Sequence, residues 1–250
     1  MTISSKSDLA GLERVGALVA LALREMERAA RPGLSTEQLD NVGEVFLRRF
    51  GARSAPQLSY GFPGFTCISV NEEIVHGVPG ARVLLPGDVV KIDVTAELDG
   101  FVADAALTLV LPPASAEARK LRRCAQRAFS RAMEVARAGF PIREIGRVVE
   151  QEVRRHHFAV VREMCGHGVG RSIHEHPSVP NYDSVLTRGM LANGMVLAIE
   201  PIISSQPATV VEEPDGWTLR THNRCLAAHY EHTVVIRDGE PLLVTLPPAA

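Results

Sequence analysis

Apolar residues recur at helical spacing in four stretches of the chain, and these stretches form two pairs. The first pair covers residues 8–30 and 35–51, where apolar positions repeat every three or four residues and a Ser-x-x-Gln capping box opens the second stretch. The second pair covers residues 117–138 and 142–157, with a Gly-Phe-Pro break between its members. The pattern therefore predicts two consecutive helices in each half of the chain.

Short β-branched and apolar runs follow each helical pair, separated by Gly, Pro and Asp-Gly turns, as is typical of strands. They cover residues 66–70, 74–78 and a hairpin over 86–110, and later residues 195–203, 209–213, 217–221 and 226–236. Helix, helix and sheet thus occur twice, and an offset of 106 residues superposes the helical pairs, with Gly33 on Gly139. The pattern predicts an α+β fold made of a duplicated unit, with helices covering one face of a largely antiparallel sheet. We expect a single domain over residues 1–250, with halves at about 8–111 and 114–240.

The hairpin contains two carboxylates and turns at Asp99-Gly100. A symmetric loop there pairs residues whose numbers sum to 199, so that Asp93 faces Ala106 and Asp104 faces Thr95. Because side chains alternate between the two faces of a strand, both carboxylates lie on one face, with Cα atoms roughly 7–8 Å apart. Two anions that converge within a sheet are costly unless a cation or protons compensate them. The hairpin therefore predicts a metal site.

Further candidate ligands occur in the second half. Glycines flank His167, which lets backbone and substrate approach it closely, and His174 follows seven residues later. Glu200 ends one apolar strand and Glu231 lies within another, where a carboxylate without a partner is rare. One histidine with four carboxylates is an oxygen-rich set that suits two divalent ions with bridging carboxylates, of the Mn, Fe, Co or Zn type.

Composition narrows the possible roles of the chain. A hydrophobic fraction of 46% over 250 residues supports a large core, and 27 basic against 29 acidic residues give a net charge of −2. This balance gives no electrostatic support for binding nucleic acid or a membrane surface. The N-terminus has no apolar segment of membrane-spanning length, so we expect a cytoplasmic protein. The four cysteines have no CxxC spacing, which favours reduced thiols.

Several polar or aromatic residues also have structural interpretations. Asp99 and Asp215 precede glycine and are typical of turns, and the His156-His157 pair ends a charged helix and is expected to be solvated. Cys67 and Trp217 fit either a packed core or a pocket wall. His76 lies in a strand-like segment that by itself indicates no role.

Taken together, the spaced motifs resemble one known family. Asn71-Glu-x-x-x-His-Gly-x-Pro, the two aspartates eleven residues apart, Gly166-His-Gly-x-Gly-Arg, Ile199-Glu-Pro and Tyr230-Glu-His-Thr are similar to those of methionine aminopeptidases of the bacterial type I. These enzymes are pita-bread metallopeptidases, and the resemblance runs from about residue 8 to residue 240. It implies the pita-bread fold, a duplicated arrangement of the kind that the pattern predicts.

The resemblance also implies a set of functional residues. The ligands of two divalent ions would be Asp93, Asp104, His167, Glu200 and Glu231. Of these, Asp104 and Glu231 would bridge the ions, and Glu200 would relay protons for a metal-bound hydroxide that attacks the peptide bond. His174 would contact the scissile amide, and His76 would hold the substrate and the tetrahedral intermediate.

The activity implied is removal of the N-terminal methionine from nascent proteins and peptides whose second residue is small. The methionine side chain would enter an apolar slot lined by Phe62, Cys67 and Trp217, which suits a flexible thioether. The expected partners are peptide substrates and nascent chains near the ribosome, and the expected state is a monomer.

The chain departs from the usual pattern of that family at five positions around the pocket. Pro56, Ser59, Ala105, Met164 and Ile173 stand where other residues are common, which affects the width of the pocket and leaves the ligands intact. Two alternatives remain open at this point. A prolyl-type aminopeptidase of the same fold would use the same ligands with another pocket, and a non-catalytic binding module would have lost ligands.

Overall fold

The computed structural model describes residues 1–247, and its helices follow the predicted pairing. The long helices are α1 (Lys6–Ala29), α2 (Thr36–Arg49), α4 (Ala116–Val135) and α5 (Arg143–Arg155), and a short helix α3 (Ala55–Tyr60) follows α2. Serine hydroxyls cap α1 to α4 by accepting a hydrogen bond from the backbone N–H three residues on. The predicted capping box of α2 is confirmed, with Ser35 and Gln38 each bonding the other's backbone.

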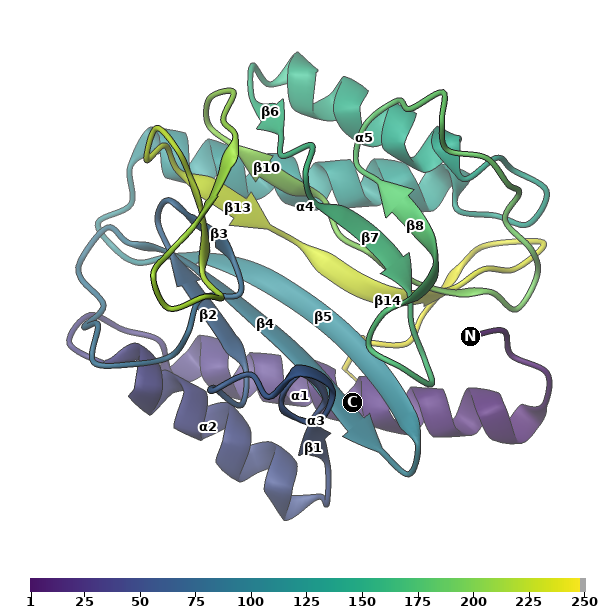
Figure 1. Cartoon of the computed structure of the whole chain (residues 1–250), viewed down its shortest axis with the longest axis horizontal. Coiled ribbons are helices and arrows are strands. Elements are labelled where there is room, and N and C mark those ends of the chain that lie inside the picture. The colour runs from purple at the N-terminus through teal and green to yellow at the C-terminus, as the bar shows by residue number, and fades with distance from the viewer. Residues whose placement is uncertain (248–250) are drawn as a thin grey trace.

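One large sheet forms the centre of the molecule (Figure 1). Its strands in spatial order are β1 (Arg53–Ser54), β4 (Val89–Leu98), β5 (Phe101–Val110), β14 (Glu231–Val235), β9 (Val196–Ile199), β7 (Cys165–Gly168) and β8 (Glu175–Pro180), with β2 (Cys67–Val70) beside β4 and β15 (Leu242–Leu243) beside β14. Each pair of neighbouring strands is antiparallel. The contact between β5 and β14 joins the first half of the chain to the second.

Two small sheets flank the large one. The first contains β13 (Ala227–His229), β10 (Ile202–Ser204) and β6 (Ala159–Val160), and the second contains β11 (Val210–Glu212), β12 (Leu219–Thr221) and β3 (Glu73–Val75). The second sheet pairs β3 of the first half with β12 of the second half, through Val75 and Leu219. The halves are therefore linked in two separate sheets.

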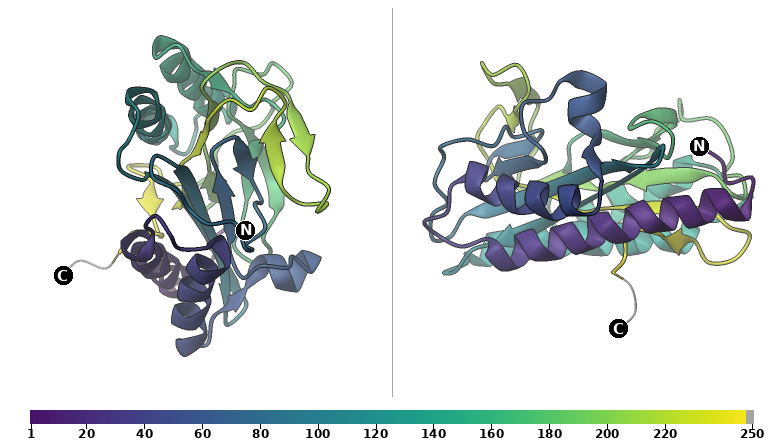
Figure 2. Two further views of the ribbon diagram at one scale, coloured as in Figure 1. Left: turned by 90° about the vertical axis from the view of Figure 1, so that its left-hand side faces the viewer. Right: turned by 90° about the horizontal axis from the view of Figure 1, so that it is seen from below.

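The four long helices lie on one side of the large sheet, as predicted (Figure 2). The helices α1 and α2 bury their apolar faces against β4 and β5 in a core that includes Leu12, Val19 and Ile92. In the second half, α4 and α5 cover a core around Phe129, Val149 and Leu197. Because the helices occupy this face, the opposite face of the sheet is left for polar side chains and a cavity. The predicted α+β fold with a duplicated plan is confirmed.

The hairpin register is also confirmed, because Asp93 pairs with Ala106 and Thr95 with Asp104. Two other strand predictions are wrong in one respect. Residues 195–203 and 226–236 do not form continuous strands, since β9 ends before Glu200-Pro201 and β13 ends before Tyr230. At the first break Pro201 has no N–H for a ladder, and the chain passes from the large sheet into a small one; at the second break it passes from that small sheet back into the large one. Both breaks lie at predicted metal ligands.

Within residues 1–247, no helix is both long and apolar enough to cross a membrane. The four cysteines all fall in this range and remain free thiols, as predicted.

Candidate active site

The β4–β5 hairpin places the first two carboxylates on the open face of the sheet. Asp104 is 5% exposed, and its Oδ1 accepts a hydrogen bond of 2.8 Å from the Thr95 hydroxyl across the hairpin. Thr233 on β14 fixes the backbone of Asp104, because its hydroxyl accepts from the Asp104 N–H and donates to the Asp104 carbonyl, each at 2.8 Å. Asp93 lies across the small Ala106 from Glu231, since Ala106 pairs with both residues. The register of three strands therefore brings three carboxylates together.

The strand breaks of the second half supply the other predicted ligands. Glu231 is the first residue of β14, and Glu200 directly follows β9, whose last residue Ile199 pairs with His232. Nε2 of His167 on β7 lies 3.3 Å from Glu200 Oε1. The Asn181 side chain donates to the Glu200 carbonyl at 2.9 Å, which holds the chain at the break. The predicted set of Asp93, Asp104, His167, Glu200 and Glu231 thus converges on one place.

The electrostatics of this cluster are those of a cation site. Burial raises the pKa of Asp93, Glu200 and Glu231 well above the usual carboxyl range, and the neighbouring carboxylates raise it further. Burial also raises the pKa of Asp104, to about 6. Asp93 Oδ1 and Glu231 Oε1 are buried and have no hydrogen-bond partner among residues 1–247. Carboxylate oxygens in this state fit divalent ions, which would supply the missing positive charge.

The imidazole of His167 has the form that a metal ligand needs. Its Nδ1 lies 2.9 Å from the Gly168 carbonyl, and a ring proton on Nδ1 leaves a lone pair on Nε2. Burial lowers the pKa of His167 to about 4, so the ring is neutral at neutral pH. Among residues 1–247, two groups of three residues place donor atoms within 4.8 Å of one another. One group contains Asp104, His167 and Glu231, and the other contains Asp93, His229 and Glu231. Glu231 belongs to both groups, as a bridging ligand would.

A cavity of about 540 Å³ opens over this cluster, and both other predicted histidines line it. The His174 ring packs edge-on against the His167 ring, with centroids 4.3 Å apart. The Tyr60 hydroxyl lies 2.6 Å from Nδ1 of His174, and when the phenol donates, the proton of the neutral ring is on Nε2. Burial lowers the pKa of His174. The ring is therefore held as a neutral donor at the edge of the carboxylate cluster.

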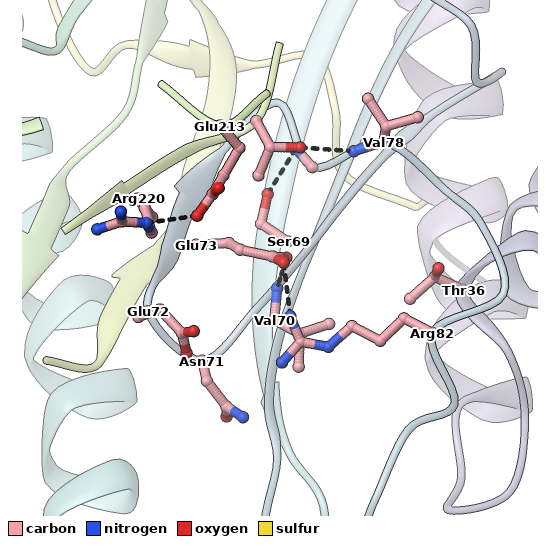
Figure 3. A network of polar contacts seen from close by, with 12 residues as sticks. Thr36, Ser69, Val70, Asn71, Glu72, Glu73, Val78, Arg82, Glu213 and Arg220 are labelled. Carbon is pink, nitrogen blue, oxygen red and sulfur yellow. Dashed lines mark hydrogen bonds and ion pairs between the residues drawn. The ribbon is translucent and has the colours of Figure 1, made fainter. Parts of the chain in front are cut away.

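His76 reaches the cavity from a strained and firmly held turn. Asn71 and His76 adopt positive φ angles of 58° and 57°, which cost non-glycine residues free energy and are concentrated at functional sites. Glu73 holds the turn by accepting hydrogen bonds from the Val70 N–H at 2.6 Å and from Arg82 at 2.5 Å (Figure 3). The turn that precedes His76 is therefore held by a polar network that the strand pattern around it does not reveal.

The three residues expected to form the side-chain slot all line the cavity. The rings of Phe62 and Trp217 meet edge to face, with centroids 5.3 Å apart, and both line the cavity with Cys67. Cys67 pairs with Asp93 across β2 and β4, so the slot adjoins the carboxylate cluster. Burial raises the pKa of the Cys67 thiol well above its usual value, which keeps this wall apolar. Of the two interpretations of Cys67 and Trp217, the structure supports the pocket wall.

Two residues of the site, His229 and Tyr60, were not predicted from the sequence. His229 is 2% exposed, and its Nε2 lies 3.2 Å from Glu231 Oε2 and 3.6 Å from Glu200 Oε2. Its position two residues before Glu231 was a usable signal, since such residues share a strand face. Tyr60 had no such signal, because its partner His174 is 114 residues away in the chain.

A histidine and four carboxylates beside a cavity of about 540 Å³ are typical of a metal-dependent hydrolase. Comparisons with known proteins agree with this class. The model of metallopeptidase family M24 matches residues 10–238, and the chain therefore belongs to that family.

Relatives and solved structures narrow the comparison further. The chain is 43% identical to methionine aminopeptidase 2 of Bacillus subtilis, over 98% of this chain and 99% of the relative. The crystal structure of methionine aminopeptidase from Thermotoga maritima superposes with a TM-score of 0.95 at 33% identity, covering 98% of this chain and 100% of that chain. Prolidase from Pyrococcus furiosus shares the fold, with a TM-score of 0.77 at 21% identity, and this chain covers 66% of it. The pita-bread fold is thus confirmed.

Proposed function

We propose that this chain is a methionine aminopeptidase, which uses divalent metal ions to release the N-terminal methionine of peptides and proteins. The observation that carries the proposal is the convergence of four carboxylates and His167 beside the apolar slot, in a chain similar over its length to methionine aminopeptidases. We assign it to the bacterial type I, as a single catalytic domain whose halves both contribute to the site. Its substrates in the cell are nascent chains near the ribosome, and it acts as a cytoplasmic monomer.

In this proposal Asp93, Asp104, His167, Glu200 and Glu231 would hold two divalent ions, and Asp104 and Glu231 would be shared between them. Bound ions of the Co, Mn, Fe or Zn type would lower the pKa of a water and polarise the scissile carbonyl. The donor set supports these ions because it combines carboxylate oxygens with an imidazole nitrogen.

The remaining residues orient the substrate and move protons. The raised pKa of Glu200 suits a carboxyl that accepts a proton from the attacking water and passes it to the leaving amine. His174, fixed through Nδ1 by Tyr60, donates from Nε2 to the scissile amide. His76, which also lines the cavity, stabilises the tetrahedral intermediate, and Phe62, Cys67 and Trp217 hold the methionine side chain.

The proposal also includes a preference for a small second residue. That residue would lie beside Ile173 and the two cavity histidines, where a bulky side chain displaces the amide, and a misplacement of about 1 Å costs roughly 10²-fold in rate. The test measures kcat/KM for Met-Xaa-Ser peptides with chelated protein and one metal added back at a time. Met-Ala, Met-Gly and Met-Ser peptides are expected to react well, and Met-Leu, Met-Lys and Met-Phe peptides hardly at all.

The same assay separates the alternatives. Preferred cleavage of Xaa-Pro peptides would identify a prolyl-type aminopeptidase, and equal rates for alanine and lysine at the second position would refute methionine excision. No turnover with any metal, together with no metal bound, would indicate a non-catalytic member of the family.

A further inference from the structure

His229 is a buried imidazole that the proposed mechanism does not use. It ends β13 at the break before Tyr230, and its ring lines the cavity beside Glu200 and Glu231. Its backbone is fixed by Thr108 on β5, whose hydroxyl accepts from the His229 N–H at 2.9 Å and donates to the His229 carbonyl at 2.7 Å. The ring is therefore built rigidly into the site, at a point where the large and the small sheet meet.

Neither ring nitrogen of His229 forms a hydrogen bond with any part of residues 1–247. Leaving buried polar atoms unpaired costs about 1–3 kcal/mol each, so an unpaired imidazole inside a folded site indicates a missing partner. The separation of 3.2 Å from Nε2 to Glu231 Oε2 is short enough for a hydrogen bond, yet the two atoms lack the required geometry. The nitrogen thus lies beside the carboxylate without being bonded to it.

This spacing is typical of two ligands of one ion. Donor atoms that each lie about 2.1 Å from a common ion are roughly 3.0–3.4 Å apart at octahedral or tetrahedral angles. The donor atoms of Asp93, His229 and Glu231 all lie within 4.8 Å of one another. Asp93 Oδ1 and Glu231 Oε1 are unpaired as well, so each of these three residues has a buried atom that lacks a partner.

We propose that His229 is a sixth protein ligand of the metal centre, binding through Nε2 the ion that Asp93 holds. This inference rests on the proposed metal site and extends it. Without His229 the ion beside Asp93 has carboxylate oxygens as its protein ligands, whereas the other ion also has the nitrogen of His167. With His229 each ion has one imidazole, and Nδ1 of His229 keeps the ring proton.

An imidazole nitrogen at the site of the ion beside Asp93 changes which divalent ions that site prefers. Carboxylate oxygens suit Mn²⁺, and imidazole shifts the preference toward Co²⁺ and Zn²⁺. In His229→Gln the affinity of the second Co²⁺ is therefore expected to fall at least about 10-fold, and that of the second Mn²⁺ to fall less. The ratio of the two affinities separates a lost ligand from a general distortion of the site, which would weaken both ions alike.

The experiment uses Co²⁺ and Mn²⁺ as probes, each titrated by itself. Calorimetric titration of chelated protein gives the number and affinity of bound ions, and proton NMR of the Co²⁺-loaded protein counts the imidazole N–H signals that the paramagnetic ion shifts. Two such signals are expected in the wild type and one in His229→Gln. The matched control is His232→Gln, three residues along the chain, because His232 already contacts Thr245 at 2.9 Å and Tyr230 at 3.2 Å; this variant should keep two signals.

The outcomes separate this inference from the proposed function. Two bound Co²⁺ ions with a single shifted imidazole in the wild type would overturn the role of His229 and leave the five-ligand site intact. An unchanged Co²⁺ to Mn²⁺ affinity ratio in His229→Gln would overturn it also. No Co²⁺ bound by the wild type would refute the metal site itself. Because the signal count is made on the wild type, the test holds even when a variant fails to fold.

Discussion

The two halves of the molecule supply their carboxylates in different ways. In the first half Asp93 and Asp104 lie within continuous strands, and the register of the β4–β5 hairpin alone puts them on one face. In the second half Glu200 directly follows one strand and Glu231 begins another, at breaks where the chain passes between the large sheet and a small one. A duplicated plan thus forms its site from two different local structures.

The difference shows what each half contributes. The hairpin is a rigid platform, because its strands are paired along ten residues each and Thr95 and Thr233 fix Asp104. Because the strands are interrupted there, Glu200, His229 and Glu231 approach the platform from the side. The side chains of an uninterrupted flat strand stand perpendicular to the sheet and could not do so. We therefore expect changes in the platform to affect metal binding, and changes in cavity residues that are not ligands to affect turnover alone.

Removing the bridging charge of the platform should have the largest effect. In Asp104→Asn the amide cannot supply the second anionic ligand, so metal affinity and activity fall together. Turnover at stoichiometric metal is expected to drop by more than about 10⁴-fold, which exceeds the contribution of a single proton-transfer group. Metal titration and peptide hydrolysis measured on the same samples check this, and normal turnover at low metal would refute the two-ion site.

A substitution of His174 in the cavity wall should instead lower turnover without lowering metal affinity. His174→Ala removes the group that is assigned to the scissile amide, and turnover should fall by roughly 10²–10⁴-fold while metal content stays normal. Elemental analysis of the variant beside its kcat gives the answer. A loss of metal in proportion to the loss of activity would show that His174 is a ligand.

Acidification should stabilise the metal-free platform. Burial raises the pKa of Asp104 from 3.8 to about 6, so its contribution to stability is fully present below pH 3.8 and is lost as the pH rises through 6. The difference corresponds to about 3 kcal/mol in the free energy of unfolding. Chelated Asp104→Asn should therefore be more stable than chelated wild type at pH 7.5, and the gap should close toward pH 4.5. Urea unfolding of both proteins measures the gap; a gap independent of pH would contradict this assignment.

A smaller effect is expected from the hydroxyl that orients Asp104. Thr95→Val removes the 2.8 Å hydrogen bond to Oδ1 and should weaken metal binding about 10–100-fold. Thr66→Val is the matched control, because Thr66 bonds a buried carboxylate of Asp40, at 2.6 Å, away from the cavity. The control should lose stability and keep its metal affinity. Equal metal affinities in Thr95→Val and wild type would show that the hairpin alone orients Asp104.

Much of the platform followed from the sequence by itself. The helical pairs, the Asp99-Gly100 turn and the shared face of Asp93 and Asp104 depend on local rules, namely the 3.6-residue and two-residue periods and the geometry of a short turn. These rules act within a single element or between neighbouring elements, so the order of residues determines the result. The motifs of the second half identified its candidate ligands, but they did not predict how these ligands are arranged in space.

Only the tertiary structure decided how these pieces meet. The strand order β5, β14, β9 brings Glu231 beside Asp93, and the breaks at Pro201 and Tyr230 turn Glu200 and His229 toward it. Tyr60 reaches His174 across 114 residues of chain, and His76 is held by a network that spans both halves. Such contacts depend on how two cores pack against one sheet. No local pattern encodes that packing, because its free energy comes from many distant side chains at once.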